Sequence, residues 1–384
     1  GLEEQLRARI DETVRTLVED GSLPAAAVEG VRFNVEAPRK GGSGDVATNV
    51  ALVLAKPAGR PPREVAQLLA ERLGKYPEVA AVEVAGPGFL NVSLRAEAFT
   101  KVLSEVLEQG RSYGHAPAAS RPRINVEFVS ANPTGPLLIS HGRGAVVGDV
   151  VARLFEVTGY RVTREYYIND FGNQVRLLAQ SVRASARGED PPEGGYGGFY
   201  VAELAKSVRE YAPELLESDD DAALSRQCVT FMLNGIPDSD LLGIRDTLAR
   251  LGIEFDVWTS EEGLHRWSKV QGTLKALDAK GRLSHAEDGS ISFVTGDEDD
   301  KDRVVRKRDG STTYFASDIA YHDDKFARGF QHLVDVWGAD HHGYIARLRS
   351  AIDAMGRDPS RFEVLLFQLV SLLRDGKPFR MGKR

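Results

Sequence analysis

The chain has 384 residues, 42% hydrophobic and 27% charged, a balance typical of a folded globular protein with two or three domains. Its 49 basic and 56 acidic side chains give a net charge of −7, so a nucleic-acid partner would need a local basic patch. No run reaches the ~18 apolar residues of a membrane-spanning helix, and the first residues do not resemble a secretion signal. The single cysteine, Cys228, excludes an internal disulfide framework and a cysteine zinc cluster, so we expect a cytoplasmic protein.

The N-terminal part has the pattern of a small α/β domain. Apolar residues recur every three or four positions over residues 2–20, which predicts an amphipathic helix. The following elements are expected to be a strand at 31–36, helices at 48–55 and 63–73, and strands at 79–84 and 88–94. We therefore expect an N-terminal domain over residues 1–112.

From Arg121 onwards the pattern becomes strand, helix, strand. A strand with one apolar face is expected at 124–128, a helix at 141–157 and a second strand at 162–168. Such a unit normally makes a right-handed crossover in a parallel sheet, so the fold class is α/β. We expect this sheet to belong to a nucleotide-binding domain over residues 121–384.

Residues 185–290 interrupt this pattern. They contain a glycine-rich stretch at 194–198 and an acidic stretch at 217–221, and we expect an insertion that splits the domain. The second half is expected to include an apolar strand at 333–337, a helix from about Tyr344 and a last helix at 363–373.

The junction between the first strand and helix of this domain is a candidate phosphate site. Unpaired backbone N–H groups and the positive end of a helix dipole attract anions, and glycines there allow close approach. His141, at the start of the helix, would donate a hydrogen bond to a phosphoryl oxygen. A glycine-rich turn that only serves helix packing is the alternative.

The same segment approaches a dinucleotide-binding fingerprint, which raises a dehydrogenase as a second alternative. Gly142, Gly144 and Gly148 supply the glycines, and Glu165 lies 21 residues beyond Gly144, where a ribose-binding acid belongs. The third glycine is one residue late, however. A slip of one residue turns it by ~100° away from the helix–strand contact, which disfavours this alternative.

Two charged groups complete the candidates. Five basic residues occupy the C-terminal end and would neutralise a triphosphate or a nucleic-acid backbone, unless they are only a solvated charged tail: Arg374, Lys377, Arg380, Lys383 and Arg384. A second group of polar residues, expected at strand ends, suits a planar cation, because a guanidinium forks two hydrogen bonds onto a carboxylate. It contains Glu127, Tyr314, Asp318 and Asp340. The segments around His322 and His341 contain potential metal ligands. Further ligands at the spacing of a metal site are missing from the sequence, so no metal site is predicted.

Together these segments resemble the arginyl-tRNA synthetases, a family of class I aminoacyl-tRNA synthetases. Five segments carry the resemblance: 44–49 with 55–57, similar to the N-terminal domain that contacts the tRNA elbow; 126–136, before the HIGH motif; 164–174, after it; 337–344, in the second half; and 380–384, at the KMSK loop. The resemblance implies a Rossmann-type parallel-sheet catalytic domain behind the small α/β domain.

It also implies roles for individual residues. Those implied to bind arginine are Glu127, Ser130, Ala131, Asn132, His141, Tyr314, Asp318 and Asp340. Those implied to bind ATP are Ser140, His141, Gly142, Gly144, Gly338, Asp340, His341, Met381 and Lys383, with His141, Arg380 and Lys383 catalytic. Gly44, Asp45 and Asn49 would contact tRNA.

The implied reaction forms arginyl-adenylate from L-arginine and ATP, with Mg²⁺ travelling on the ATP, and then charges tRNA(Arg). The implied enzyme is a cytoplasmic monomer without a protein-bound metal.

This sequence departs from the family pattern at three places. The HIGH positions contain Leu138 and Ser140 in place of the first histidine and the glycine, and the KMSK positions contain Gly382 in place of serine. The chain stops at Arg384, where the family continues into a helical anticodon-binding domain. These departures leave open a paralogue that binds or activates arginine for another acceptor, or acts as a binding module.

Overall fold

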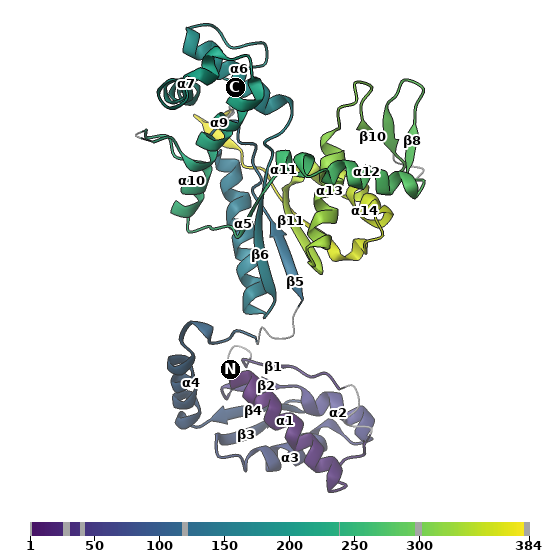
Figure 1. Ribbon diagram of the computed structural model, residues 1–384. Helices are drawn as coiled ribbons and strands as arrows, with labels where there is room; N and C mark the ends of the chain where they lie inside the picture. The colour runs from purple at the N-terminus through teal and green to yellow at the C-terminus, as the bar shows by residue number, and fades with distance from the viewer. Residues whose placement is uncertain are drawn as a thin grey trace. The chain divides into compact units, whose positions relative to one another are not determined.

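The computed structural model describes residues 2–25, 31–38, 43–116, 122–237, 239–295 and 302–379. The chain divides into two compact units, Gly1–His115 and Ala116–Arg384, drawn from purple to yellow in Figure 1. Each unit has a buried apolar core of its own.

The first unit contains a four-stranded antiparallel sheet in the order β1-β2-β4-β3. Its elements are α1 (Leu2–Glu19), β1 (Val35–Glu36), β2 (Val46–Thr48), α2 (Val50–Ala58), α3 (Pro62–Leu73), β3 (Val79–Ala85), β4 (Phe89–Leu94) and α4 (Ala96–Gln109). The strand expected at 31–36 is reduced to its last two residues, because only Val35 and Glu36 pair with β2. Helix α2 begins later than expected, since Thr48 still pairs with Leu90.

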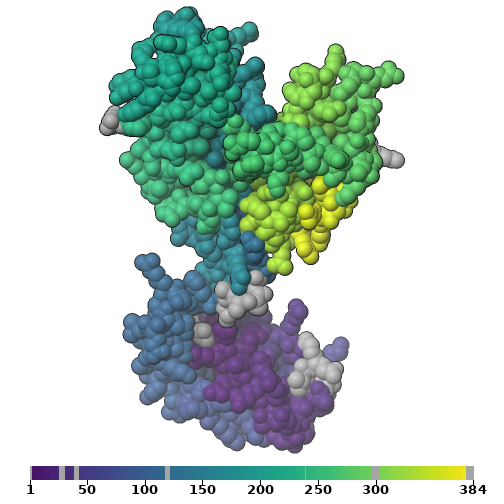
Figure 2. Space-filling view, in the orientation of Figure 1, coloured from purple at the N-terminus to yellow at the C-terminus, as the bar shows by residue number. Residues whose placement is uncertain are grey.

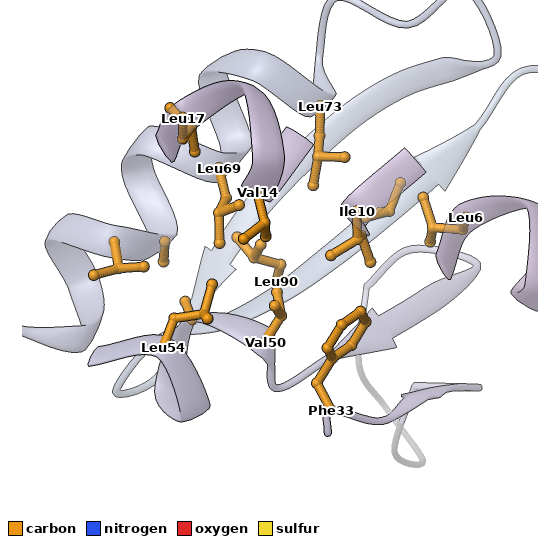
Figure 3. Close-up of a cluster of buried hydrophobic side chains, with 14 of the residues drawn as sticks. Leu6, Ile10, Val14, Leu17, Phe33, Val50, Leu54, Leu69, Leu73 and Leu90 are labelled. Atoms are coloured by element: carbon orange, nitrogen blue, oxygen red, sulfur yellow. The ribbon is translucent and has the colours of Figure 1, made fainter. Parts of the chain in front are cut away.

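The core of this unit is formed by the apolar stripe of α1 (Figure 3). Leu6, Ile10, Val14 and Leu17 are all at most 5% exposed, and they recur at the spacing of one helix face. They cluster with Leu90 of β4 and with apolar residues of α2 and α3. The 3.6-residue period of the sequence therefore predicted both the helix and its buried face.

The second unit is built on a five-stranded sheet in the order β12-β11-β5-β6-β7, in which every pair is parallel. The five strands are β5 (Arg123–Glu127), β6 (Arg161–Ile168), β7 (Val257–Ser260), β11 (His332–Gly338) and β12 (Phe362–Phe367). Helix α5 (Ile139–Val157) connects β5 to β6 and contacts both strands and β11. The predicted α/β fold with a Rossmann-type parallel sheet is confirmed.

The remaining elements of this unit are mostly helices. They are α6 (Asn173–Arg187), α7 (Phe199–Tyr211), α8 (Glu214–Glu217), α9 (Asp221–Asn234), α10 (Ile244–Arg250), α11 (Glu261–Arg266), α12 (Lys269–Ala279), α13 (Tyr314–Ala327), the 3₁₀ turn η4 (Ala339–Tyr344) and α14 (Ile345–Ala354). Three short strands, β8 (Leu283–His285), β9 (Ile291–Phe293) and β10 (Arg303–Arg306), form a separate antiparallel sheet, and β13 (Leu372–Arg374) pairs with β14 (Lys377–Phe379). Figure 2 shows the teal α7–α9 region and the green β8–β10 region as two projections of this unit with a hollow between them.

Two sequence predictions differ from this architecture. The last helix expected at 363–373 is wrong: Phe362–Phe367 is strand β12, because the apolar run pairs along its whole length with β11. A short apolar run has the same hydrophobic signal as a buried helix segment, so its period did not distinguish the two. Within the expected insertion at 185–290, β7 pairs with β6 and extends the main sheet. The boundaries of an inserted segment therefore stay a prediction.

The expectation that Gly148 points away from the helix–strand contact is also wrong. A Cβ atom at Gly148 would overlap the ring of Phe128, which follows β5, so the glycine allows α5 to pack closely on the sheet. We expect Gly148→Ala to lower the free energy of unfolding by about 1–3 kcal/mol, because the core has no room for the methyl group. Urea unfolding measures this change.

Gly142→Ala provides the matched control on the same helix. A Cβ atom at Gly142 has no neighbour within 4 Å, so the substitution should be neutral or stabilise the helix by about 0.5–1 kcal/mol. Equal unfolding midpoints for the two variants would contradict the packing role of Gly148.

Candidate functional site

A cleft opens at the carboxyl ends of the central strands. The chain runs from β5 to β6 and β7 on one side of the sheet, and β11 and β12 lie on the other side of β5. The strand order therefore reverses between β5 and β11, the place where open α/β sheets bind ligands. The cleft has a volume of about 550 Å³ and includes the ends of both strands and the start of α5.

Most of the predicted catalytic-domain residues line this one cleft. They are Glu127, Ser130, Ala131, Asn132, Ser140, His141, Gly144, Tyr314, Asp318, Gly338, Asp340 and His341. Gly142 lies on α5 but is not among the lining residues. Arg380, Met381, Gly382 and Lys383 fall outside the described residues.

The loop after β5 supplies the first wall of the cleft. Val129 and Ser130 have φ angles of 67° and 39°, a left-handed conformation that costs non-glycine residues roughly 1–3 kcal/mol each. Two hydrogen bonds of the Ser130 hydroxyl stabilise the turn: it donates to Glu127 Oε1 at 2.8 Å and accepts from the Tyr167 backbone N–H at 3.1 Å. The hydroxyl of Tyr166 donates to the carbonyl of Ala131 at 2.8 Å. Local strain at the cleft is thus maintained by contacts from β6.

Helix α13 supplies the acidic wall. Tyr314 and Asp318 lie one turn apart on this helix. The sequence analysis expected them at strand ends. The hydroxyl of Tyr344 donates to Asp318 Oδ2 at 2.5 Å and so orients the carboxylate. Burial raises the pKa of Asp318 to about 6, although the Tyr344 hydrogen bond opposes this shift.

A second acidic side chain in the cleft, Glu261, was missed by the sequence analysis. It begins α11 directly after β7 and is only 5% exposed. Burial, together with the neighbouring charges of Asp318 and Asp170, raises its pKa to about 7, although a hydrogen bond from Ser317 opposes this shift. The sequence did contain a sign of this residue, a polar Ser-Glu-Glu run at the end of a short apolar strand. That strand lies in the segment that was interpreted as an insertion.

The first turn of α5 lies at the cleft. The backbone N–H of Leu138 donates to Nδ1 of His141 at 2.8 Å, which fixes the imidazole at this turn. A Cβ atom at Gly144 would come within 2.9 Å of the Phe367 ring, so this glycine allows β12 to approach the helix. The positive end of the α5 dipole therefore faces the cleft, where it favours negative charge.

The loop after β11 forms the opposite wall. Gly338 ends β11, and a Cβ atom there would collide with the Asp340 side chain. Asp340 and His341 follow on the turn η4 with side chains more than half exposed, and Nε2 of His341 lies 3.7 Å from Asp340 Oδ2. These two polar groups remain available to a ligand in the cleft.

A buried charged network forms part of the cleft lining, through Glu127, His322 and Asp335. Glu127, His322 and Asp335 offer ligand atoms within 4.8 Å of one another, the spacing of a metal site. The ammonium group of Lys325 lies 2.5 Å from Glu127 Oε2 and 3.0 Å from Asp335 Oδ1. The Lys325 ammonium therefore bridges the two carboxylates. Although burial lowers the pKa of Lys325, Asp335 and Glu127 raise it more.

The three residues implied to contact tRNA flank β2 in the first unit. Gly44 has a φ of 87°, and a Cβ atom there would meet the Val92 carbonyl oxygen at 3.0 Å. Asp45 Oδ2 accepts from the Leu94 N–H at 2.8 Å, and Asn49 Oδ1 accepts from the Asn34 N–H at 2.7 Å. These contacts position the loop before β2 and the start of α2, and they do not depend on a ligand.

Comparison with known proteins decides the family. The chain matches the arginyl tRNA synthetase N terminal domain over residues 3–94 and the catalytic domain of class I (R) tRNA synthetases over residues 102–383. The chain belongs to the arginyl-tRNA synthetase family. The dinucleotide-binding alternative is thereby set aside, and buried Glu165, which binds Arg328 at 2.9 Å, has a structural role.

Individual members of the arginyl-tRNA synthetase family are similar over most of this chain. An arginine–tRNA ligase of Nitratidesulfovibrio vulgaris (strain DP4) is 46% identical over 92% of the chain and 64% of its own length. One from Citrifermentans bemidjiense is 44% identical over the whole chain and 69% of its own length. A solved structure assigned as an arginyl-tRNA synthetase of Campylobacter jejuni has a TM-score of 0.63 at 35% identity, over 73% of this chain and 62% of that one.

The chain thus spans about two thirds of the length of these family members. Among the described residues, none of the helices is long and apolar enough to cross a membrane.

Proposed function

We propose that the chain activates L-arginine with ATP to arginyl-adenylate and transfers arginine to tRNA(Arg). The carboxylate of arginine would attack the α-phosphorus of ATP, forming a C–O–P linkage and releasing pyrophosphate. The ribose hydroxyl of the tRNA end would then displace AMP. Such transfer depends on in-line placement of the reactants and on neutralising the charge that moves toward the leaving pyrophosphate.

The observation that carries this proposal is the pair of carboxylates, Asp318 and Glu261, in the cleft beside the start of α5. A guanidinium is the cation that two converging carboxylates and a tyrosine suit, because its planar donors reach several acceptors at once. Tyr344 occupies Oδ2 of Asp318, which leaves Oδ1 for the substrate. Tyr314 would cover the guanidinium with its ring.

The reacting end of arginine would lie at the loop after β5. Ser130, Ala131 and Asn132 would hold its amino and carboxylate groups, and Glu127 would act through its hydrogen bond from Ser130. His141 would lie between this end and the α-phosphate, where the α5 terminus favours negative charge. Asp340 would reach the ribose or the amino group.

ATP would occupy the side of the cleft formed by Ser140, Gly144, Gly338 and His341. Arg380 and Lys383, with Met381, would steady the triphosphate in this proposal. Magnesium would arrive on the triphosphate as part of the substrate.

The tRNA proposal is supported by the match of residues 3–94 to the family's N-terminal domain. Gly44, Asp45 and Asn49 would contribute by shaping the contact loop. An enzyme with this substrate would work in the cytoplasm, and we propose that it does so as a monomer.

Incubation with labelled arginine and ATP, with and without tRNA(Arg), tests the function. We expect arginine-dependent AMP formation and charged tRNA, and no charging with lysine. Arginine binding without AMP in either condition would favour the binding-module alternative. Charging of a small-molecule amine but not of tRNA would favour a paralogue with another acceptor.

Arginine binding should depend on pH, because both candidate carboxylates must be ionised to pair with a guanidinium. Burial raises the pKa of Asp318 to about 6 and that of Glu261 to about 7, so both gain protons as the pH falls from 8 to 6. We expect the dissociation constant to rise roughly tenfold over this interval and arginine binding to release protons. Calorimetric titrations in buffers of different ionisation enthalpy measure both effects.

Glu261→Gln is the control for the pH dependence. It should remove the part of the proton release that occurs near pH 7 and leave the part assigned to Asp318. An affinity for arginine that stays constant between pH 6 and pH 8 would contradict the assignment.

A further inference from the structure

Lys325 is a buried charged residue for which the proposed chemistry has no direct use. It lies on α13 seven residues after Asp318 and three after His322, so the three residues share one face of the helix. Its side chain is 0% exposed. A lysine is almost never fully buried without partners, and here the partners are specific.

The ammonium group of Lys325 contacts two strands and one ring. It lies 2.5 Å from Glu127 Oε2 at the end of β5 and 3.0 Å from Asp335 Oδ1 on β11. The Tyr321 ring centroid is 4.4 Å from the same nitrogen. Lys325 therefore joins α13 to the two strands between which the sheet order reverses.

The network continues from Lys325 toward both ends of the amino-acid site. Glu127 Oε1 accepts from the Ser130 hydroxyl, so Lys325 is two contacts away from the strained turn of Val129 and Ser130. On the other side, Nε2 of His322 lies 2.9 Å from Asp335 Oδ2, and Nδ1 of His322 lies 2.8 Å from the Asp318 carbonyl oxygen.

The charges in this network are paired. Both ring nitrogens of His322 face acceptors, the Asp335 carboxylate and the Asp318 carbonyl oxygen. The Lys325 ammonium lies between the Glu127 and Asp335 carboxylates, so each buried carboxylate has a cationic partner, without which a buried charge is costly. Removal of Lys325 alone leaves the buried Glu127 carboxylate without a cationic partner, while it still accepts from the Ser130 hydroxyl.

We propose that Lys325 is a positioning residue of the amino-acid site, which holds the Ser130 turn and the acidic face of α13 in register through Glu127 and Asp335. It does not touch the substrate. The proposal rests on the proposed function only for the identity of the ligand, L-arginine. It predicts that arginine affinity depends on Lys325, and that this dependence acts through the charge of Glu127.

The test compares Lys325→Met, Glu127→Gln and the double variant in the 384-residue chain by calorimetric titration with arginine and, separately, with ATP. Lys325→Met should weaken arginine binding at least about tenfold and ATP binding less than about twofold. The double variant should recover most of the lost arginine affinity, because the neutral amide introduced by Glu127→Gln still accepts from Ser130 and Asp335 keeps His322. A lysine retained only for packing would not be rescued by a change at residue 127.

Any of three results would overturn the proposal. The arginine affinity of Lys325→Met could lie within twofold of that of the unaltered chain, or the variant could lose equal affinity for arginine and for ATP. The third result is a double variant that recovers no arginine affinity. If Lys325→Met does not fold, recovery of folding by the added Glu127→Gln supports the charge link, and two unfolded variants refute it.

Failure of the proposed function has a separate signature, since the unaltered chain would then bind no arginine. Crystal structures of the variants would then test the connection between Lys325 and the Ser130 turn. Val129 and Ser130 should lose their positive φ angles in Lys325→Met and keep them in the double variant.

Discussion

Asp318→Asn should weaken arginine binding by about 100-fold or more while ATP binding changes less than about threefold, because it removes one partner of a desolvated charge pair. Asparagine has nearly the same volume and still offers an oxygen to the Tyr344 hydroxyl, so the wall of the cleft should survive. The loss would then report the missing charge and not a collapsed site. Calorimetric titration with each ligand measures it.

Asp353→Asn is the matched control. Asp353 lies exposed on α14, outside the residues that line the cleft, and its replacement changes the net charge equally. Arginine binding by this variant should equal that of the unaltered chain. If Asp318→Asn retains normal arginine affinity with an intact fold, the guanidinium site is elsewhere.

Leu138→His combined with Ser140→Gly should raise the rate of adenylate formation by about 10–100-fold, since one preorganised hydrogen-bond donor to a developing charge is typically worth ~10²–10³ in rate. Leu138 precedes α5, and its N–H already holds His141 in place, so a histidine there would add a donor without disturbing the existing one. Pyrophosphate exchange measures the rate.

Ser140→Gly alone separates the two changes. It restores backbone freedom at the first turn of α5 but adds no donor, and we expect less than about a threefold gain. Unchanged turnover of the double variant, with a normal unfolding curve, would mean that another group already replaces the missing histidine.

The elements with the strongest periodic patterns were predicted from the sequence. Helix α1 shows its buried face at the spacing of Leu6, Ile10 and Val14, and the alternation around Val126 identified β5. Strand β12 was assigned as a helix because its pairing partner, β11, lies about 30 residues earlier and leaves no local signal. Partner strands are supplied by the fold, and a run of six residues of which five are apolar is compatible with either structure.

The residues of the candidate site were predicted only in part, for the same reason. Motif residues such as Ser130, Asn132 and Asp318 were found because their order along the chain is specific, and they do line one cleft. Glu261 and Lys325 were missed, since each has a partner more than 50 positions away in sequence, Asp318 for Glu261 and Glu127 for Lys325.

The sequence by itself therefore determined the fold class, the family and the segments that meet at the cleft, because helical and strand periods and motif order are local properties. Only the tertiary structure decided which carboxylates lie together, that an ammonium bridges Glu127 and Asp335, and that Tyr344 orients Asp318. Charge and burial act over a few ångströms of space, and those distances exist only after strands remote in the chain have been placed side by side.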